Sequence, residues 1–436
     1  MFEFLKYIHS GNYYRLVNQM PQAILSFPTI QESRVGYISK ESRLMDIAYG
    51  HLQSGWIPKS KCERNALQDQ MISSIDDNYI FINRHFSKSQ VIWVLMIRLL
   101  SFRNPLVEIY SFVKALKHNR VKIESKEYKD FEIFNNLLIQ SNPLVSVIIP
   151  TLNRYEYLKD VLADLEKQDY IHFEVIVCDQ SEPIDETFYQ RWNLNIQLIK
   201  QEEKALWMAR NRCIRQSKGD YILLFDDDSR VETNWISNHL KCLEYFQVSI
   251  SAGVTHTLVG GGLGKKDTYF HLSDVFDTGN AMVKREVFKK VGLFDRQFEK
   301  QRMGDSEFGI RSLLGGFLIV ANPNAQRVHL KVGTGGLRQM GSWDAIRPQN
   351  LLAPRPIPSV LYLIRKYHGV REAILYLIKN IPQSYIPYKF KGNKKAKLLI
   401  YIAFPVWFIL AIVSVLKSWN LATLKLRQGS LIEFLD

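Results

Sequence analysis

The sequence predicts an α/β fold in which a mostly parallel sheet is flanked by helices. Four short, largely apolar segments, at residues 145–150, 173–178, 195–200 and 221–225, alternate with segments of helical periodicity. Polar residues directly follow three of the four segments. Strands that alternate with helices are typical of a parallel sheet with right-handed crossovers.

The individual elements follow from their apolar patterns. Residues 145–150 (VSVIIP) form an apolar run of the kind found in strands that are covered on both faces. Between the first two strands, Leu158, Val161, Leu162 and Leu165 recur at helical spacing, and a second apolar face runs through residues 206–214. Asn153, three residues before Glu156, predicts a capping box at the start of the first helix.

Length and local composition predict three parts. The chain has 436 residues, enough for two or three domains. Residues 1–142 are expected to form an N-terminal accessory domain of unknown role, residues 143–350 the α/β domain, and residues 351–436 a basic and apolar helical region. The segment Ser141-Asn142-Pro143 is a plausible boundary, because proline and asparagine favour turns.

The C-terminal region predicts contact with a membrane. The net charge is +14, and residues 365–397 hold nine Lys or Arg against one acid. Residues 398–416 carry no charge, which is long enough for a membrane span. A spanning helix, a helix in the membrane plane and a buried soluble helix remain open. Deleting residues 389–436 is expected to release the protein from membranes.

Other features exclude some classes of protein. The four cysteines have no spacing typical of a zinc site, so reduced thiols are expected. The N-terminal residues mix charged and apolar side chains and do not predict a secretory signal. No basic and aromatic module typical of nucleic-acid binding is present, so no nucleic-acid partner is expected.

The chemistry is expected where the strands end, because ligands of open α/β sheets bind beyond the carboxyl ends of the strands. The polar residues at these ends are Thr151, Asn153 and Arg154 after Pro150, then Asp179, then Asp226, Asp227 and Asp228. Three adjacent carboxylates repel one another, and a divalent cation relieves that repulsion. Mg²⁺ and Mn²⁺ prefer such oxygen ligands. A solvated acidic turn is the alternative for these three aspartates.

The order of motifs between residues 145 and 338 resembles that of the family 2 glycosyltransferases. The matching segments are VSVIIPTLNR (145–154), VIVCDQS (175–181), ARN (209–211), GDYILLFDDD (219–228), TGNAMVKREVFKKVGLFD (278–295), GDSEFGIR (304–311) and the H-x-x-x-G stretch from His329. The resemblance implies a GT-A fold for residues 143–350 and metal-dependent, inverting transfer of a sugar from a nucleotide-sugar donor.

The resemblance also implies roles for individual residues. Pro150, Thr151, Asn153, Arg154 and Asp179 would line the nucleotide pocket, and Arg210 would neutralise the pyrophosphate or hold the aspartate cluster. Asp226 and Asp228 form the Asp-x-Asp pair, with Asp227 between them. His329 would complete a site for Mn²⁺ or Mg²⁺, which offsets the charge that grows on the leaving group.

Two acids of the segment 304–307 would act on the acceptor side. Asp305 would be the general base that removes the proton of the acceptor hydroxyl, and Glu307 would orient the acceptor or the sugar. Gly279 and Asn280 would lie near the donor sugar. Two positions depart from the family pattern: Gly304 replaces a common Glu, and Trp207 stands where many members have a small residue.

The predicted protein is therefore a bacterial glycosyltransferase at the cytoplasmic face of the inner membrane. A UDP-sugar is the expected donor, and a glycan or lipid-linked glycan is the expected acceptor. The alternatives are a non-catalytic membrane scaffold derived from a transferase and a sugar-phosphate nucleotidyltransferase. The latter needs a glycine- and arginine-rich loop after the first strand, where this chain has Thr-Leu-Asn-Arg.

Overall fold

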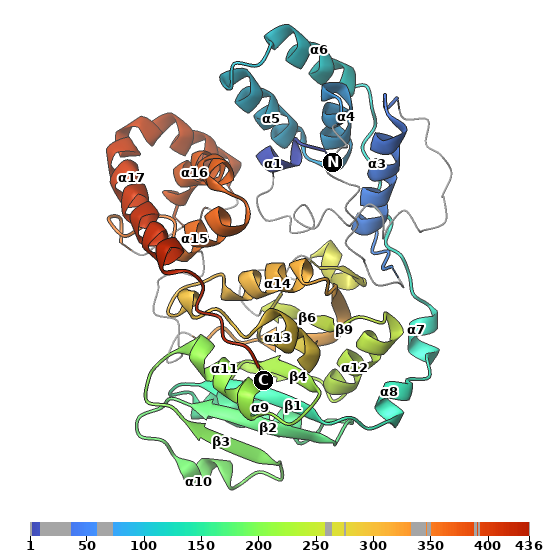
Figure 1. Ribbon diagram of the computed structural model, residues 1–436, viewed down its shortest axis with the longest axis vertical. Helices are drawn as coiled ribbons and strands as arrows, with labels where there is room; N and C mark the ends of the chain where they lie inside the picture. Colours follow the sequence, from blue (N-terminus) through green and yellow to red (C-terminus); the bar gives the residue numbers. More distant parts are fainter. Residues whose placement is uncertain are drawn as a thin grey trace.

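A computed structural model of the chain describes residues 2–8, 36–58, 73–257, 264–273, 276–332, 346, 350–387, 390 and 393–435. The described residues form an α/β part around a twisted sheet and a layer of helices from both ends of the sequence (Figure 1). The predicted mixture of a sheet with flanking helices is confirmed.

Nine strands of the described residues form one sheet, in the order β3-β2-β1-β4-β8-β6-β9-β5, with β7 paired to β9. Their bounds are β1 Val145–Thr151, β2 Phe173–Asp179, β3 Ile196–Lys200, β4 Tyr221–Phe225, β5 Ser229–Val231, β6 Ile250–Thr257, β7 His271–Leu272, β8 Asn280–Lys284 and β9 Ile319–His329. The four strands expected from the sequence are β1 to β4, and they are parallel as predicted. The other half is mixed, because β8 runs antiparallel to β4 and β6.

Helices cover both faces of the sheet and carry the expected apolar faces. Those of the α/β part and its entry are α7 Asp130–Ile133, α8 Leu137–Gln140, α9 Tyr155–Leu165, α10 Glu186–Tyr189, α11 Leu206–Gln216, α12 Trp235–Tyr245, η3 Lys265–Thr268, α13 Arg285–Val291, η4 Arg296–Phe298 and α14 Gly304–Leu314. The expected capping box at α9 is wrong. Arg154 is the N-cap residue and makes no side-chain cap, while Asn153 adopts a positive φ of 53°.

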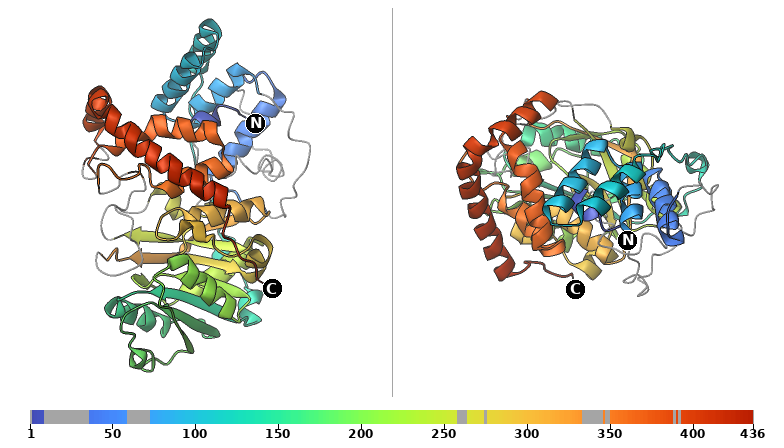
Figure 2. Two further views of the ribbon diagram at one scale, coloured as in Figure 1. Left: turned by 60° about the vertical axis from the view of Figure 1, so that its left-hand side comes forward. Right: turned by 90° about the horizontal axis from the view of Figure 1, so that it is seen from above.

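The remaining helices form a second layer. They are α1 Leu5–Ile8, α3 Lys40–Gln53, α4 Ile75–His85, α5 Lys88–Leu100 and α6 Pro105–Ala115 from the N-terminal region, with α15 Pro358–Tyr367, α16 Val370–Ser384 and α17 Lys394–Gln428 from the C-terminal region. Figures 1 and 2 show α5, α6 and the start of α17 at the end of the molecule away from β3 and α10.

Specific contacts join the two groups of helices to each other and to the sheet. The ammonium group of Lys379 on α16 donates to the carbonyl of Ile8 on α1 at 2.8 Å. The residues after α17 return to the α/β part, where the amide of Leu293 donates to the carbonyl of Glu433 at 2.7 Å. The C-terminal tail is therefore part of the packed structure. Deleting residues 389–436 would also remove the contact between Leu293 and Glu433.

Two further sequence features can be compared with the structure. Cys178, Cys213 and Cys242 are free and buried, as expected of reduced thiols, while Cys62 lies outside the described residues. Among the described residues, one helical stretch, Ile402–Gln428 of α17, is long and apolar enough to cross a membrane by length and composition.

Candidate active site

Strand register brings the polar strand ends together. β1 and β4 pair with Ile148 opposite Leu224, so Thr151 lies level with Asp227, and its hydroxyl donates to the Asp227 carboxylate at 2.8 Å. On the other side, β5 pairs with β9 so that His329 lies opposite Ser229. Because Ser229 follows Asp228, this pairing places the histidine beside the aspartate cluster.

Two buried arginines hold Asp226. Arg210 of α11 donates to one carboxylate oxygen at 2.7 Å, and Arg327 of β9 donates to the other at 2.8 Å. Arg327 also contacts Asp277 at 3.0 Å. A Cβ atom at Gly279 would lie 1.9 Å from the Arg327 guanidinium and 2.2 Å from the Asp226 carboxylate. Gly279, predicted to admit the donor sugar, thus makes room for this ion pair.

Asp226, Asp228 and His329 offer three ligand atoms within 4.8 Å of one another. His329 Nε2 lies 3.2 Å from Asp228 Oδ1, and Arg154 contacts Asp228 Oδ2 at 3.2 Å and Asp227 at 2.9 Å. Two carboxylates and one imidazole fit the ligand preference of Mn²⁺ or Mg²⁺. The carboxylate of Asp226 is 19% exposed, so this cluster has access to solvent.

The aspartates have different electrostatic environments. Burial alone would raise the pKa of Asp226, but the charges of Arg327 and Arg210 outweigh it and hold that pKa well below its usual range. Asp226 is thus ionised at neutral pH. Burial raises the pKa of Asp227 to about 6, although Arg154 and the Thr151 hydroxyl lower it. Asp226 and Asp227 therefore do not titrate alike.

The surroundings of Asp179 differ from the prediction. This residue is completely buried, and its carboxylate accepts hydrogen bonds from the Tyr155 hydroxyl at 2.6 Å, the Tyr189 hydroxyl at 2.7 Å and the Ser181 amide at 2.8 Å. In this conformation the Asp179 side chain is buried and held by protein donors, and its contact with a nucleotide base stays a prediction. Asp179 positions two tyrosines at the end of β2, and Asn153 lies nearby, with its amide donating to Ser181.

Asn280 also differs from the prediction. Its amide nitrogen donates to the carbonyls of Val254 and Ala325, both at 3.0 Å, and its amide oxygen contacts the Trp235 and His239 rings at 2.8 and 3.1 Å. The side chain is completely buried and all of its polar atoms have partners. Asn280 therefore ties strands and helix together and does not face a donor sugar.

The two acids of α14 lie in different surroundings. Asp305 is in the first turn and half-buried, and one of its oxygens accepts the amide of Ser306 at 2.7 Å. Glu307 is completely buried, and its carboxylate contacts Arg311 at 2.9 Å, Lys366 at 3.2 Å and Tyr367 at 2.6 Å. The predicted acceptor contact of Glu307 is not possible here, because the side chain has no exposed surface.

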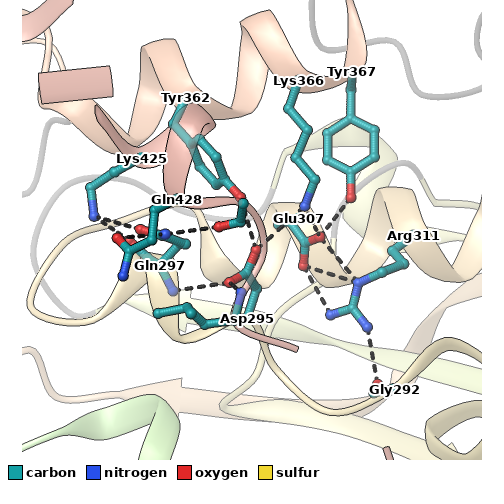
Figure 3. Close-up of polar contacts among 12 residues, drawn as sticks. Gly292, Asp295, Gln297, Glu307, Arg311, Tyr362, Lys366, Tyr367, Lys425 and Gln428 are labelled. Carbon is teal, nitrogen blue, oxygen red and sulfur yellow. Dashed lines mark hydrogen bonds and ion pairs between the residues drawn. The ribbon is translucent and has the colours of Figure 1, made fainter. Parts of the chain in front are cut away.

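Figure 3 shows that Glu307 belongs to a polar cluster between α14, η4 and the C-terminal helices. Asp295 lies in the same cluster and accepts from the Tyr362 hydroxyl at 3.1 Å and from Lys366 at 3.3 Å. Lys425 of α17 donates to the carbonyl of Gln297 at 2.6 Å. This cluster fixes α15 and α17 to the helix that carries Asp305.

The two departures from the family pattern lie against each other. A Cβ atom at Gly304 would lie only 2.3 Å from the ring of Trp207, so the indole occupies the space of a side chain at position 304. The guanidinium of Arg210 lies 5.3 Å from the same ring. Trp207 therefore connects the start of α14, next to Asp305, with the arginine that holds Asp226.

Arg327 and Asp277 were not predicted from the sequence. A signal for Arg327 is present, because side chains two residues apart on a strand share a face, and Arg327 precedes His329 by two residues on β9. Asp277 follows no apolar strand, and only the tertiary fold brings it close to Arg327.

Asp277 also lines a cavity of about 460 Å³ between α3, the end of α4 and β6. Tyr49 and His85 contribute to the opposite wall.

Comparisons with known proteins agree with this architecture. Residues 146–292 match the sequence profile described as glycosyl transferase family 2. "Glycosyltransferase AglE" of Haloferax volcanii is 30% identical over 166 residues, 36% of this chain and 53% of the relative. "Glycosyltransferase GlyA" of Streptococcus pneumoniae is 26% identical over 164 residues, 36% of this chain and 22% of the relative. The matched part thus spans about half or less of these relatives.

Among solved structures, Staphylococcus aureus TarS residues 1–349 in complex with UDP-GlcNAc is similar at a TM-score of 0.43 and 15% identity, with 65% of this chain and 92% of that chain covered. The profile match spans β1, β2, β4 and the aspartate cluster, and both curated relatives are named as glycosyltransferases. Residues 146–292 therefore carry a glycosyl transferase family 2 domain.

Proposed function

We propose that the chain transfers a sugar from a nucleotide-sugar donor to a hydroxyl acceptor, with inversion at the anomeric carbon. The observation that carries this proposal is the cluster of Asp226, Asp228 and His329 at the carboxyl edge of the sheet. These residues would hold Mn²⁺ or Mg²⁺, which supplies charge stabilisation for the departing nucleoside diphosphate. Arg154 and Arg210, which already contact the aspartates, would help to balance the diphosphate charge.

Asp305 is proposed as the general base. Its carboxylate would accept the proton of the acceptor hydroxyl while that oxygen forms a bond to the anomeric carbon and the bond to the diphosphate breaks. Its place at the start of α14 supports this role, because Gly304 and Trp207 connect that turn to Arg210 and Asp226. The fully buried Glu307 is assigned no contact with substrate.

The cavity beside Asp277 is proposed to bind a part of the acceptor away from the reacting hydroxyl, because Asp305 does not line this cavity. Tyr49 and Phe86 supply aromatic surface, while Gln53 and Thr255 supply hydrogen-bonding groups, which is the combination that recognises a sugar ring. Through Arg327, Asp277 is one side chain away from Asp226. A glycan or lipid-linked glycan is proposed as acceptor, and a UDP-sugar as donor.

Membrane attachment through α17 belongs to the same proposal. Ile402, Val406 and Ile409 are exposed on this helix, and the adjoining segment is strongly basic. A basic segment beside an apolar helix supports contact with an anionic membrane surface, and we place the protein at the cytoplasmic face of the inner membrane. The division into domains at residues 142 and 350 is likewise proposed.

Donor hydrolysis by the purified full chain tests the proposal. UDP-, GDP- and dTDP-sugars are incubated with and without Mn²⁺, and the released nucleotide is measured for the native chain, Asp228→Ala and Asp305→Asn. Asp130→Asn is the control, because this aspartate is exposed on α7. Metal-dependent release that is lost in Asp228→Ala is expected.

Two other outcomes would contradict parts of the proposal. Absence of both turnover and metal-dependent nucleotide binding would favour a non-catalytic scaffold. Full transfer activity of Asp305→Asn, measured once an acceptor is found, would remove Asp305 as the base.

A further inference from the structure

We propose that the α5–α6 hairpin is a second membrane-binding element, which inserts its tip into an anionic lipid surface. Its outward side is apolar although it faces solvent: Phe102 is 99% exposed, Leu106 79% and Leu100 72%. Ile92 and Met96 of α5 and Val107, Ile109, Tyr110 and Val113 of α6 are exposed as well. A soluble surface rarely gathers so many large apolar side chains without a partner.

The inward side of the hairpin is tightly packed, so the exposed surface belongs to a well-formed element. Arg98 donates to both oxygens of Glu108 at 2.8 and 2.5 Å, and the Tyr79 hydroxyl contacts the same carboxylate at 2.8 Å. Val91 and Val94 of α5 are completely buried among the N-terminal helices. Both helices are thus apolar on the packed side and on the exposed side. Helices that are apolar all round are typically surrounded by protein or by lipid.

Charge identifies the partner as an anionic surface. Residues 86–123 contain seven Lys or Arg and one acid, Glu108. Since Glu108 is buried and paired with Arg98, the exposed rim of the hairpin carries no carboxylate from this segment. Exposed cations include Arg103 at the tip, with Lys117 and Arg120 at the base. Each basic residue near an anionic bilayer adds to the attraction.

The position of the hairpin agrees with this partner. The α5–α6 tip and the start of α17 lie at the same end of the molecule (Figures 1 and 2). Lys379 links α16 to α1, which in turn packs against α5, so the two elements belong to one continuous layer of helices. A single bilayer surface at this end would contact both elements, leaving the sheet and the aspartate cluster in the aqueous phase.

A fluorescent label at the tip tests the proposal in the full chain. Phe102→Cys is made together with Cys62→Ser, since the other three cysteines are buried, and labelled with an environment-sensitive dye. Ile171→Cys in the same background is the matched control, because Ile171 is 83% exposed, two residues before β2. Vesicles of phosphatidylglycerol and phosphatidylcholine, with and without brominated acyl chains, are added.

We expect the emission at position 102 to shift to the blue and to be quenched by brominated lipid, with no change at position 171. Leu100→Glu with Leu106→Glu should lower the partition into these vesicles by roughly tenfold or more, and Ile171→Glu should not.

Three outcomes would overturn the proposal: no vesicle binding by the native chain, binding without any change at position 102, or a blue shift that needs no lipid and grows with protein concentration. The last outcome would assign the hairpin to contact with a second copy of the chain.

Discussion

At the residue scale, Gly304 and Trp207 act as a complementary pair. Adding a methyl group at position 304 forces the indole or the start of α14 to move, because the new Cβ would lie 2.3 Å from the ring. Gly304→Ala is expected to lower the free energy of unfolding by about 1–3 kcal/mol. In a Trp207→Ala background the same change should cost much less, and urea unfolding of the four proteins measures the difference. Equal costs in both backgrounds would contradict the pairing.

Arg327 is the second residue on which the site depends. It is buried between Asp226 and Asp277, so Arg327→Gln removes the cation that pairs with Asp277 and one of the two cations that pair with Asp226. Removing one partner of a buried pair costs about 3–5 kcal/mol, and metal-dependent donor turnover should fall with it. Arg230→Gln is the control, because Arg230 pairs with Asp164 but is 43% exposed. Turnover is measured below the unfolding temperature of the variant. If Arg327→Gln then turns over the donor as fast as the native chain, Arg327 does not belong to the site.

The aspartate cluster could be predicted from the sequence because it follows directly from an apolar strand. Asp226 and Asp228 come after β4, and only the position of strand ends was needed to find them. Asp277, Tyr189 and Glu299 were not predicted, since tertiary packing rather than a local sequence pattern brings each of them close to the site. Glu299 accepts the amides of Trp207 and Met208 at 3.1 and 3.2 Å, a contact without any sequence pattern.

At the scale of elements, α14 connects the proposed base to the C-terminal helices. Burial would raise the pKa of Glu307, but Arg311, Lys366 and the Tyr367 hydroxyl lower it, so the carboxylate is charged. Glu307→Gln removes that charge and should cost about 3 kcal/mol of stability, because Arg311 loses its buried carboxylate partner and Lys366 loses one of its two. Glu156→Gln, exposed on α9, is the control for urea unfolding. A change below about 0.5 kcal/mol would contradict this role.

Helix α12 carries a buried histidine that makes stability depend on pH. Burial lowers the pKa of His239 to about 4, although contacts with Asn280 and Ser251 raise it. The unfolded chain therefore binds a proton between about pH 6.5 and 4 that the folded chain does not, and about 3 kcal/mol of stability is lost across this range as the pH falls.

The effect of Asp227 on the pH dependence of stability has the opposite sign, because its pKa of about 6 lies above the pKa of an aspartate in the unfolded chain. The test is therefore the difference between the native chain and His239→Gln in urea unfolding at pH 7 and pH 4.5. Native stability should fall more steeply with acid, and parallel behaviour of the two proteins would contradict the assignment to His239.

At the scale of the whole molecule, the sequence predicted the α/β part better than the helical layer. The strands β1 to β4 are continuous apolar runs, which local patterns reveal. Apart from the apolar run at residues 91–97, the N-terminal helices gave no such signal, because their apolar residues divide between a core with Phe2 and Phe4 and an exposed surface. Helices α3 and α4 line the cavity beside Asp277 together with residues more than 150 positions away in the sequence. Local patterns do not reveal such contacts.

The manner in which α17 meets a membrane also depends on the whole molecule. Ala411, Ser414, Ser418 and Ala422 form a buried stripe, and the Ser418 hydroxyl donates to the carbonyl of Pro356 at 2.6 Å. The second half of α17 is thus held against the protein. The helix before Ala411 contributes too few free residues to cross a bilayer, which takes about 20. We therefore expect α17 to lie in the interface.

Ile409→Lys distinguishes the two arrangements, because Ile409 is 75% exposed on the apolar side of α17. A lysine at the centre of a spanning helix costs about 3 kcal/mol, or roughly 100-fold in partition, whereas in the interface its long side chain reaches water. We expect a loss of only several-fold in co-sedimentation of the full chain with anionic vesicles, and none for Ile171→Lys. A loss of about 100-fold would indicate a span, and no loss would show that the membrane contact lies elsewhere. The α5–α6 hairpin would then be the remaining candidate for that contact.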